Sequence, residues 1–234
     1  TIGSVPGVQV NVSGPTAATV DSNDVLHRSA PLVFGFVLAL AFLLRLVTFR
    51  SIVVPIKAIV LTLLSVGAAY GSLVLIFQKG WGESLLGFQS NGRIASWIPL
   101  FLFVILFGLS MDYHVFILSR IREAFDGGMS TDDAVKHGIK STAGVVTSAA
   151  VVMVAVFAIF ATLSFIDMKQ VGVGLALAVL IDATIIRGVL LPASMKLLGE
   201  RNWYLPRWLE WLPRTSPERS PAAVPGRVAP DAAG

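Results

Sequence analysis

The sequence predicts an all-α polytopic membrane protein with five transmembrane helices, and two observations carry this prediction. Hydrophobic residues make up 55% of the chain and charged residues only 14%, with a mean hydropathy of +0.77, well above that of a soluble domain. Five apolar runs are also each long enough for a helix to cross a bilayer, which takes about 20 mostly apolar residues. The runs lie at residues 31–49, 52–77, 97–119, 144–165 and 170–195.

The Lys and Arg residues lie mostly on one side of these five runs. With the N-terminus outside, thirteen of the 18 basic residues fall in inner segments and four in outer segments, while Arg187 lies inside the last run. Cytoplasmic segments of membrane proteins carry an excess of Lys and Arg. The sequence therefore predicts that the N-terminus faces outside and the C-terminus inside. Arg45, near the inner end of the first run, is expected to extend its side chain to the lipid headgroups.

Residues 1–30 are polar enough to lie in water. Within them Val8, Val10 and Val12 alternate with polar residues, a pattern typical of a half-buried strand. One strand cannot pair its own backbone or bury its own apolar face, so the rest of its sheet must come from elsewhere. We therefore expect residues 1–30 to be the remnant of an extracytoplasmic domain, and the chain to be part of something longer.

The rest of the chain divides into three predicted parts. Residues 31–198 form the five-helix transmembrane domain. Residues 199–214 are predicted to form an amphipathic interfacial segment, because Trp208 and Trp211 can share one helix face while charged residues turn toward water. Pro, Ala and Ser dominate residues 215–234, which we expect to be a disordered cytoplasmic tail.

Asp112 is a charged residue in the middle of the third apolar run. Residues 98–110 carry no ionisable side chain, and helix rise places Asp112 about 22 Å from the outer end of its span. A carboxylate at such a depth costs about 2.5–3.5 kcal/mol on insertion scales, so a chain that keeps one usually needs it for a partner, a proton or an ion. Tyr113 beside it supplies a hydroxyl that can donate to the carboxylate or relay a proton. These two residues are the first candidates for a buried proton relay.

Asp182 and Arg187 are the ionisable residues of the last apolar run, and helix rise puts them in the same layer as Asp112. At 3.6 residues per turn they lie about 140° apart around their helix, so the two side chains are not expected to face each other. An Asp112–Arg187 pair between neighbouring spans is geometrically allowed. The alternatives are that Arg187 extends inward or ties helices together, and that Asp182 only hydrogen-bonds to a neighbouring helix.

Thr147 and Ser148 in the fourth run are the polar residues best able to extend such a relay. The alternative is that their hydroxyls bond back to carbonyls of their own helix, as Ser and Thr often do. His114 points about 160° away from Asp112 around the helix, so we expect it to line or pack the helix interface and not to join the relay.

Parts of the last three runs resemble a known transporter family. Residues 97–123, with the motif Gly108-Leu-Ser-Met-Asp-Tyr113, closely resemble the tenth span of MMPL transporters. These are the mycobacterial-membrane-protein-large type of the resistance–nodulation–division (RND) superfamily. Residues 147–157 and 182–192 resemble its eleventh and twelfth spans, and the likeness extends over residues 15–200 with the motifs in the right order.

The resemblance implies a proton-motive-force-driven exporter of lipids or other hydrophobic molecules at the plasma membrane. The five predicted spans correspond to the last five of such a transporter, and Asp112 and Tyr113 match the Asp-Tyr pair of its second half. Asp182, Arg187, Thr147 and Ser148 are second-tier candidates. A family member has twelve spans in two halves, so the chain needs the N-terminal half, or a partner chain that supplies it, to transport anything.

Two other classes of function are alternatives to an exporter. In a non-transporting membrane scaffold or partner subunit, the buried polar residues would only fix helix packing. A membrane enzyme is disfavoured, because the sequence has no Ser-His-Asp set, no phosphate-binding loop and no cysteine, and its three histidines are dispersed. We therefore expect no cofactor, no metal site and no nucleic-acid partner; the expected partners are the lipid bilayer and a hydrophobic or lipidic substrate.

Overall fold

A computed structural model describes residues 14–206 apart from residue 91, together with residues 209 and 211. The described residues form helices and connecting loops, with no strand among them. The strand predicted at residues 8–12 and the tail predicted at residues 215–234 lie outside this part of the chain, as does much of the interfacial segment predicted at residues 199–214.

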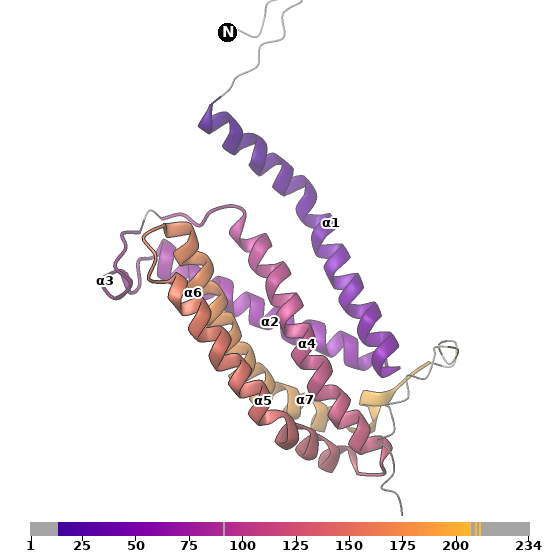
Figure 1. The fold of residues 1–234 in the computed structure, drawn as a ribbon. Coiled ribbons are helices and arrows are strands. Elements are labelled where there is room, and N and C mark those ends of the chain that lie inside the picture. The colour runs from indigo at the N-terminus through magenta and orange to yellow at the C-terminus, as the bar shows by residue number, and fades with distance from the viewer. Residues whose placement is uncertain (1–13, 91, 207–208, 210, 212–234) are drawn as a thin grey trace, which may run out of the picture.

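The described chain consists of long helices joined by short connections (Figure 1). In chain order the elements are α1 (Pro15–Phe49), α2 (Val53–Leu73), the π-helix η2 (Val74–Gln78), α3 (Glu83–Leu86), α4 (Ile98–Asp126), α5 (Thr131–Phe160), α6 (Ile166–Ile181), the π-helix η3 (Asp182–Leu190), α7 (Leu191–Leu198) and the 3₁₀-helix η4 (Gly199–Trp203).

Within the described residues, five helical stretches are long and apolar enough to cross a membrane. They are α1, α2 with η2, α4, α5, and the continuous stretch from α6 to η4. The predicted fold class of five transmembrane helices is therefore confirmed. The orientation of these helices across the bilayer stays a prediction.

Several helices run beyond the apolar runs from which they were predicted. Helix α1 begins at Pro15, where proline suits the first turn, and continues without a break into the first apolar run. Helix α4 extends into a charged segment in which Arg122 and Asp126 pair at 2.9 Å with the i,i+4 spacing of a helix. Helix α5 begins after Ser130, whose hydroxyl accepts a hydrogen bond from the backbone N–H of Asp133. Local caps and pairs thus prolong the helices into the flanking polar sequence.

Helix α5 packs against α4 and α6, and these two helices contact α2, whereas the N-terminal half of α1 stands away from the bundle (Figure 1). Two glycines allow the closest approaches. A Cβ atom at Gly138 of α5 would lie 2.4 Å from the side chain of Ile121 on α4, and one at Gly172 of α6 would lie 2.4 Å from Phe160 on α5. Small residues at such crossings let helix backbones approach closely in membrane proteins. The large exposed apolar side chains on α1 and α5, such as Leu32 and Val151, suit a surface that faces lipid.

Candidate functional site: a buried ion pair beside Tyr113

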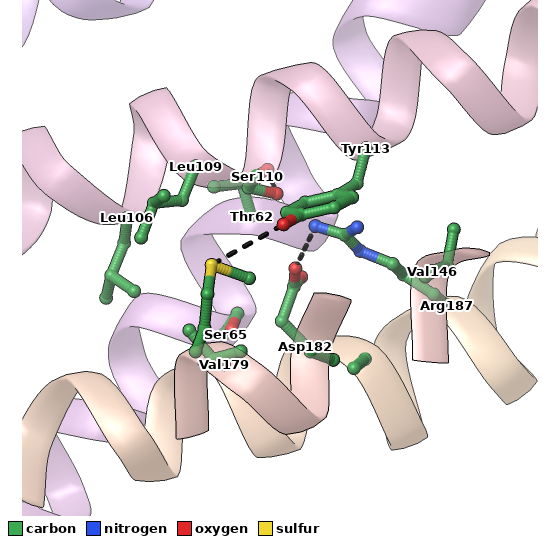
Figure 2. Close-up of a pocket in the computed structure, with 13 residues that line it drawn as sticks. Thr62, Ser65, Leu106, Leu109, Ser110, Tyr113, Val146, Val179, Asp182 and Arg187 are labelled. Carbon is green, nitrogen blue, oxygen red and sulfur yellow. Dashed lines mark hydrogen bonds and ion pairs between the residues drawn. The ribbon is translucent and has the colours of Figure 1, made fainter. Parts of the chain in front are cut away.

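Asp182 and Arg187 form a buried ion pair inside the last span. The Arg187 Nη2 donates to Asp182 Oδ2, and each residue is only 6% exposed. The guanidinium of Arg187 also lies over the ring of Tyr113, 4.6 Å from its centroid, in a cation–π contact (Figure 2). The structure therefore brings together Tyr113, Asp182 and Arg187, three of the residues that the sequence proposed for the site.

The prediction that Asp182 and Arg187 do not face each other was wrong, because it assumed an α-helix. The segment from Asp182 to Leu190 is a π-helix, in which hydrogen bonds join residues five apart, so residues i and i+5 lie one above the other. The Asp112–Arg187 pair that the sequence allowed is not formed; Arg187 binds Asp182 instead. An Asp and an Arg five residues apart inside an apolar run are the sequence signal that could have indicated this π-helix.

Ser110 connects the ion pair to two other helices, and sequence reasoning missed it. Its hydroxyl lies 3.3 Å from Thr62 Oγ1 on α2 and 3.0 Å from His114 Nδ1 on α4, and it faces the Asp182 carboxylate across a shared cavity. His114 Nδ1 is also 2.9 Å from the backbone oxygen of Ser110, which can only accept. This nitrogen therefore carries the proton and donates, which leaves Nε2 as the unprotonated nitrogen of the ring in its neutral form.

The cavity beside the ion pair is small and mostly apolar. Its lining includes Leu106, Val146, Val179, Thr62, Ser110 and the Asp182–Arg187 pair. Tyr113 Oη lies 3.5 Å from Met153 Sδ across it (Figure 2). Its volume is about 20 Å³, enough for one water molecule. The Oδ1 atom of Asp182 is buried without a hydrogen-bond partner among the described residues, so a water here would have a polar atom to bind.

Asp112 lies on the other side of α4, and the prediction that it is buried was wrong for this chain. It is exposed and forms no hydrogen bond or ion pair with a described residue. Its side chain lines an open hollow of about 930 Å³ with Arg50 at the end of α1, Arg122 farther along α4 and Trp203 of η4. The cause is helix geometry: consecutive residues point about 100° apart, so Asp112 faces the hollow while Tyr113 faces the ion pair.

Thr147 and Ser148 do not join this cluster. Both are exposed on α5, and Ser148 Oγ donates to the backbone oxygen of Val145 at 3.0 Å. Ser148 thus bonds back to its own helix, which is the alternative to a relay role.

Arg45 was expected at the membrane surface, and that prediction was wrong. The residue has 0% exposure, and its Nη1 donates to the backbone oxygen of Ala41 at 3.3 Å. Helices α2 and α4 pack on α1, and the Arg45 side chain is fully covered by protein instead of reaching the lipid headgroups.

No group of three or more potential metal ligands (His, Cys, Asp or Glu) occurs in the described part of the chain. The cluster of Ser110, Tyr113, Asp182 and Arg187 places charged and hydrogen-bonding groups in a layer that water hardly reaches.

The family of the chain is decided by comparison with protein-family models. The model described as "MMPL family" matches residues 2–223. The chain belongs to the MMPL family. This confirms the resemblance noted in the sequence and identifies the five helices as those of a multi-pass integral membrane protein.

Curated relatives of this MMPL chain include named transporters. It is 46% identical over 211 residues to "Mycolic acid-containing lipids exporter MmpL11" of Mycolicibacterium smegmatis, covering 88% of this chain and 22% of the relative. It is 46% identical over 201 residues to "Heme uptake protein MmpL11" of Mycobacterium tuberculosis, covering 86% of this chain and 21% of the relative. It is 38% identical over 204 residues to "Trehalose monomycolate exporter MmpL3" of Mycolicibacterium smegmatis, covering 87% of this chain and 20% of the relative. The MMPL chain thus spans about a fifth of the length of these relatives.

Proposed function

We propose that this MMPL chain is the C-terminal transmembrane portion of an exporter that uses the proton-motive force to move lipids or other hydrophobic small molecules out across the plasma membrane. The names of two relatives, an exporter of mycolic acid-containing lipids and a trehalose monomycolate exporter, support the substrate class. Since the chain spans about a fifth of each relative, transport requires an N-terminal half or a partner chain. Residues 1–30 would belong to an outer domain, residues 199–214 to the inner interface and residues 215–234 to a cytoplasmic tail.

The observation that carries the proposal is the position of Tyr113 between Asp112 and the buried ion pair. Asp112 on one side of α4 is the proposed proton acceptor, and a proton moving inward through 100 mV releases about 2.3 kcal/mol. Tyr113 is the next residue and contacts Arg187 through its ring. A change of charge at Asp112 that rotates or shifts α4 would therefore move the ring over Arg187 and disturb the ion pair in the last span.

The exposure of Asp112 also fits this proposal. A carboxylate that opens onto a hollow of about 930 Å³ can meet groups from another half of the transporter, where the family resemblance places a second Asp-Tyr pair. Thr147 and Ser148 receive less support as relay members, since both are exposed on α5, away from the ion pair.

The scaffold alternative predicts a different effect of replacing Asp112. An export assay on the complete transporter distinguishes the exporter from the scaffold. Because Asp112 forms no hydrogen bond or ion pair with a described residue, Asp112→Asn should leave the fold intact. Export of a labelled mycolate-type lipid from cells that produce the complete protein should fall at least about tenfold, with unchanged protein abundance and thermal stability. The matched control is Asp24→Asn on the exposed part of α1, which should export normally. Undiminished export by Asp112→Asn would falsify the relay, and a loss of stability would favour the scaffold.

A further inference from the structure

Residues 79–97, which connect η2 to α4, lie across the ends of α2 and α6 on the side of the bundle predicted to face outside (Figure 1). We call this segment, apart from residue 91, the strap. Bonds within the strap fold it locally. The backbone N–H of Ser90 donates to Glu83 Oε1 at 2.8 Å, and that of Phe88 donates to the backbone oxygen of Glu83 at 3.3 Å. The strap thus has a local structure of its own.

Lys169, near the start of α6, fastens the strap at the end of α3. Its Nζ donates to the backbone oxygens of Leu86 at 2.5 Å and of Gly87 at 3.5 Å. A helix leaves its last carbonyl groups without partners of its own, and a lysine side chain can bind them. Because Lys169 is only 5% exposed, its ammonium group has little access to water, and these carbonyls stabilise it.

The next residue, Gln170, fastens the strap a second time. Its Nε2 donates to the backbone oxygen of Arg93 at 3.0 Å, and its Oε1 accepts from the backbone N–H of Ala95 at 3.3 Å. One side-chain amide therefore bonds to two alternate residues of the strap, as a residue of a neighbouring parallel strand would. Gln170 is only 1% exposed, so loss of these bonds would leave polar groups without partners where water hardly reaches.

Apolar contacts join the strap to two spans. Phe88 and Ile94 pack on a buried cluster that includes Phe77 of η2 and Val171 of α6. The rings of Phe77 and Phe88 lie 4.8 Å apart. Residues 169–175 of α6 are all buried, so this end of the last span is covered on every side. One segment of chain thus holds the end of α2 and the end of the last span together.

We propose that the strap is a latch for the last span, which opens and closes as one unit and which Lys169 and Gln170 hold closed. While the strap is closed, it holds this end of α6 against α2 and α4; opening it frees this end to move. Twelve residues separate Gln170 from Asp182, about 18 Å along the helix, so the latch is distinct from the ion pair. It does not depend on the proposed transport.

Hydrogen exchange of the full chain in detergent micelles tests this proposal. The reporters are the backbone amides of Phe88 and Ser90, which are bonded within the strap and not to α6. If the strap opens as one unit, Gln170→Leu should speed the exchange of both reporters at least about tenfold, because it removes one of the two fastenings. The matched control is Gln89→Leu, an exposed glutamine of the strap, which should change their exchange less than about twofold.

The same comparison applies to the lysine. Lys169→Met should speed the exchange of both reporters, whereas Lys79→Met, at an exposed position of the strap, should not. Amides of α5 should keep their native exchange in all four variants, because the strap opens without the rest of the chain. The proposal is overturned if Gln170→Leu speeds exchange at Ala95 alone. A general increase that includes α5 overturns it as well, because the strap would then not open separately.

A second measurement requires no variant. Amides that exchange through one opening event respond equally to low concentrations of denaturant and share one opening free energy. The amides of Phe88, Ser90 and Ala95 should converge in this way in the native chain, at a free energy below that of global unfolding. Three unrelated opening free energies, or opening only when the whole chain unfolds, would overturn the strap as a unit.

Discussion

Asp182 and Arg187 form an ion pair across one turn of π-helix, so both charges of the pair belong to the same span. The pair therefore does not need a second helix to exist, unlike most buried ion pairs between transmembrane segments. What the second helix adds is the ring of Tyr113, which covers the guanidinium from α4. The π-helix thus presents a paired charge to the face of α4 that carries Tyr113.

Breaking this pair should destabilise the chain strongly. Asp182→Asn leaves Arg187 buried without its anion, and we expect the free energy of unfolding in micelles to fall by about 3–5 kcal/mol. The double variant Asp182→Asn with Arg187→Met should lose less than the sum of the two single variants, because it leaves no unpaired charge at the pair. The surface pair Arg120–Glu123 is the control, where Glu123→Gln should cost less than about 1 kcal/mol. Additive losses at Asp182 and Arg187 would contradict a direct interaction.

Tyr113 contributes a hydroxyl to the proposed relay and an aromatic ring to the contact with Arg187, and two substitutions distinguish these contributions. Tyr113→Phe keeps the ring over Arg187, so stability should stay within about 0.5 kcal/mol of the native chain, while a relay that uses the hydroxyl should fail in the export assay. Tyr113→Leu removes the ring as well and should lower stability by about 1–2 kcal/mol in denaturant titrations. Equal stability of the Phe and Leu variants would show that the ring does not stabilise the guanidinium.

The helices were predictable from sequence because a bilayer imposes a length and a composition that are easily read. Five apolar runs became five long helices, and the family likeness that rested on residues 97–123 was confirmed. The polar residues were harder, because their partners depend on which side of a helix they occupy. An ideal α-helix separates Asp182 from Arg187, and only the π-helix brings them together.

Position along a helix also did not determine burial. Arg45 lies close enough to the end of an apolar run to reach lipid headgroups, yet neighbouring helices cover it completely. Asp112 lies deep in its run but faces an open hollow. Ser110 is an ordinary residue for a transmembrane helix, and its contacts to Thr62 and His114 required knowledge of which helices are neighbours.

The close helix crossings predict which glycines resist substitution. A Cβ at Gly138 would lie 2.4 Å from the Ile121 side chain and 2.9 Å from the Ile121 backbone nitrogen, so Gly138→Ala must push α4 and α5 apart. We expect a loss of about 1–3 kcal/mol in the free energy of unfolding. Gly144→Ala on the same helix has nothing within 4 Å and should be neutral or slightly stabilising, since alanine favours helix. The same response at both positions would contradict the crossing.

The end of the last span is tied to the connection between α1 and α2 by Asn202. Its Nδ2 donates to the backbone oxygens of Met195 and Gly199 at 2.7 and 2.6 Å, and its backbone oxygen accepts from Ser51 Oγ at 2.6 Å. Its Oδ1 accepts from Lys57 Nζ at 2.9 Å. One buried amide thus satisfies groups from two distant parts of the chain.

Replacing the Asn202 side chain should remove its two bonds within the last span and its bond to Lys57 of α2. Asn202→Ala leaves the Lys57 ammonium and two carbonyl groups buried without partners, and we expect the free energy of unfolding in micelles to fall by about 2–4 kcal/mol. Asn202→Asp keeps an acceptor for Lys57 and supplies a counterion but loses both Nδ2 donor bonds, so its loss should be smaller. The exposed amide of Gln78 is the control, where Gln78→Ala should change stability by less than about 0.5 kcal/mol. If Asn202→Asp were as unstable as Asn202→Ala, the bond to Lys57 would contribute little, and the loss would come from the two Nδ2 bonds to Met195 and Gly199 within the last span.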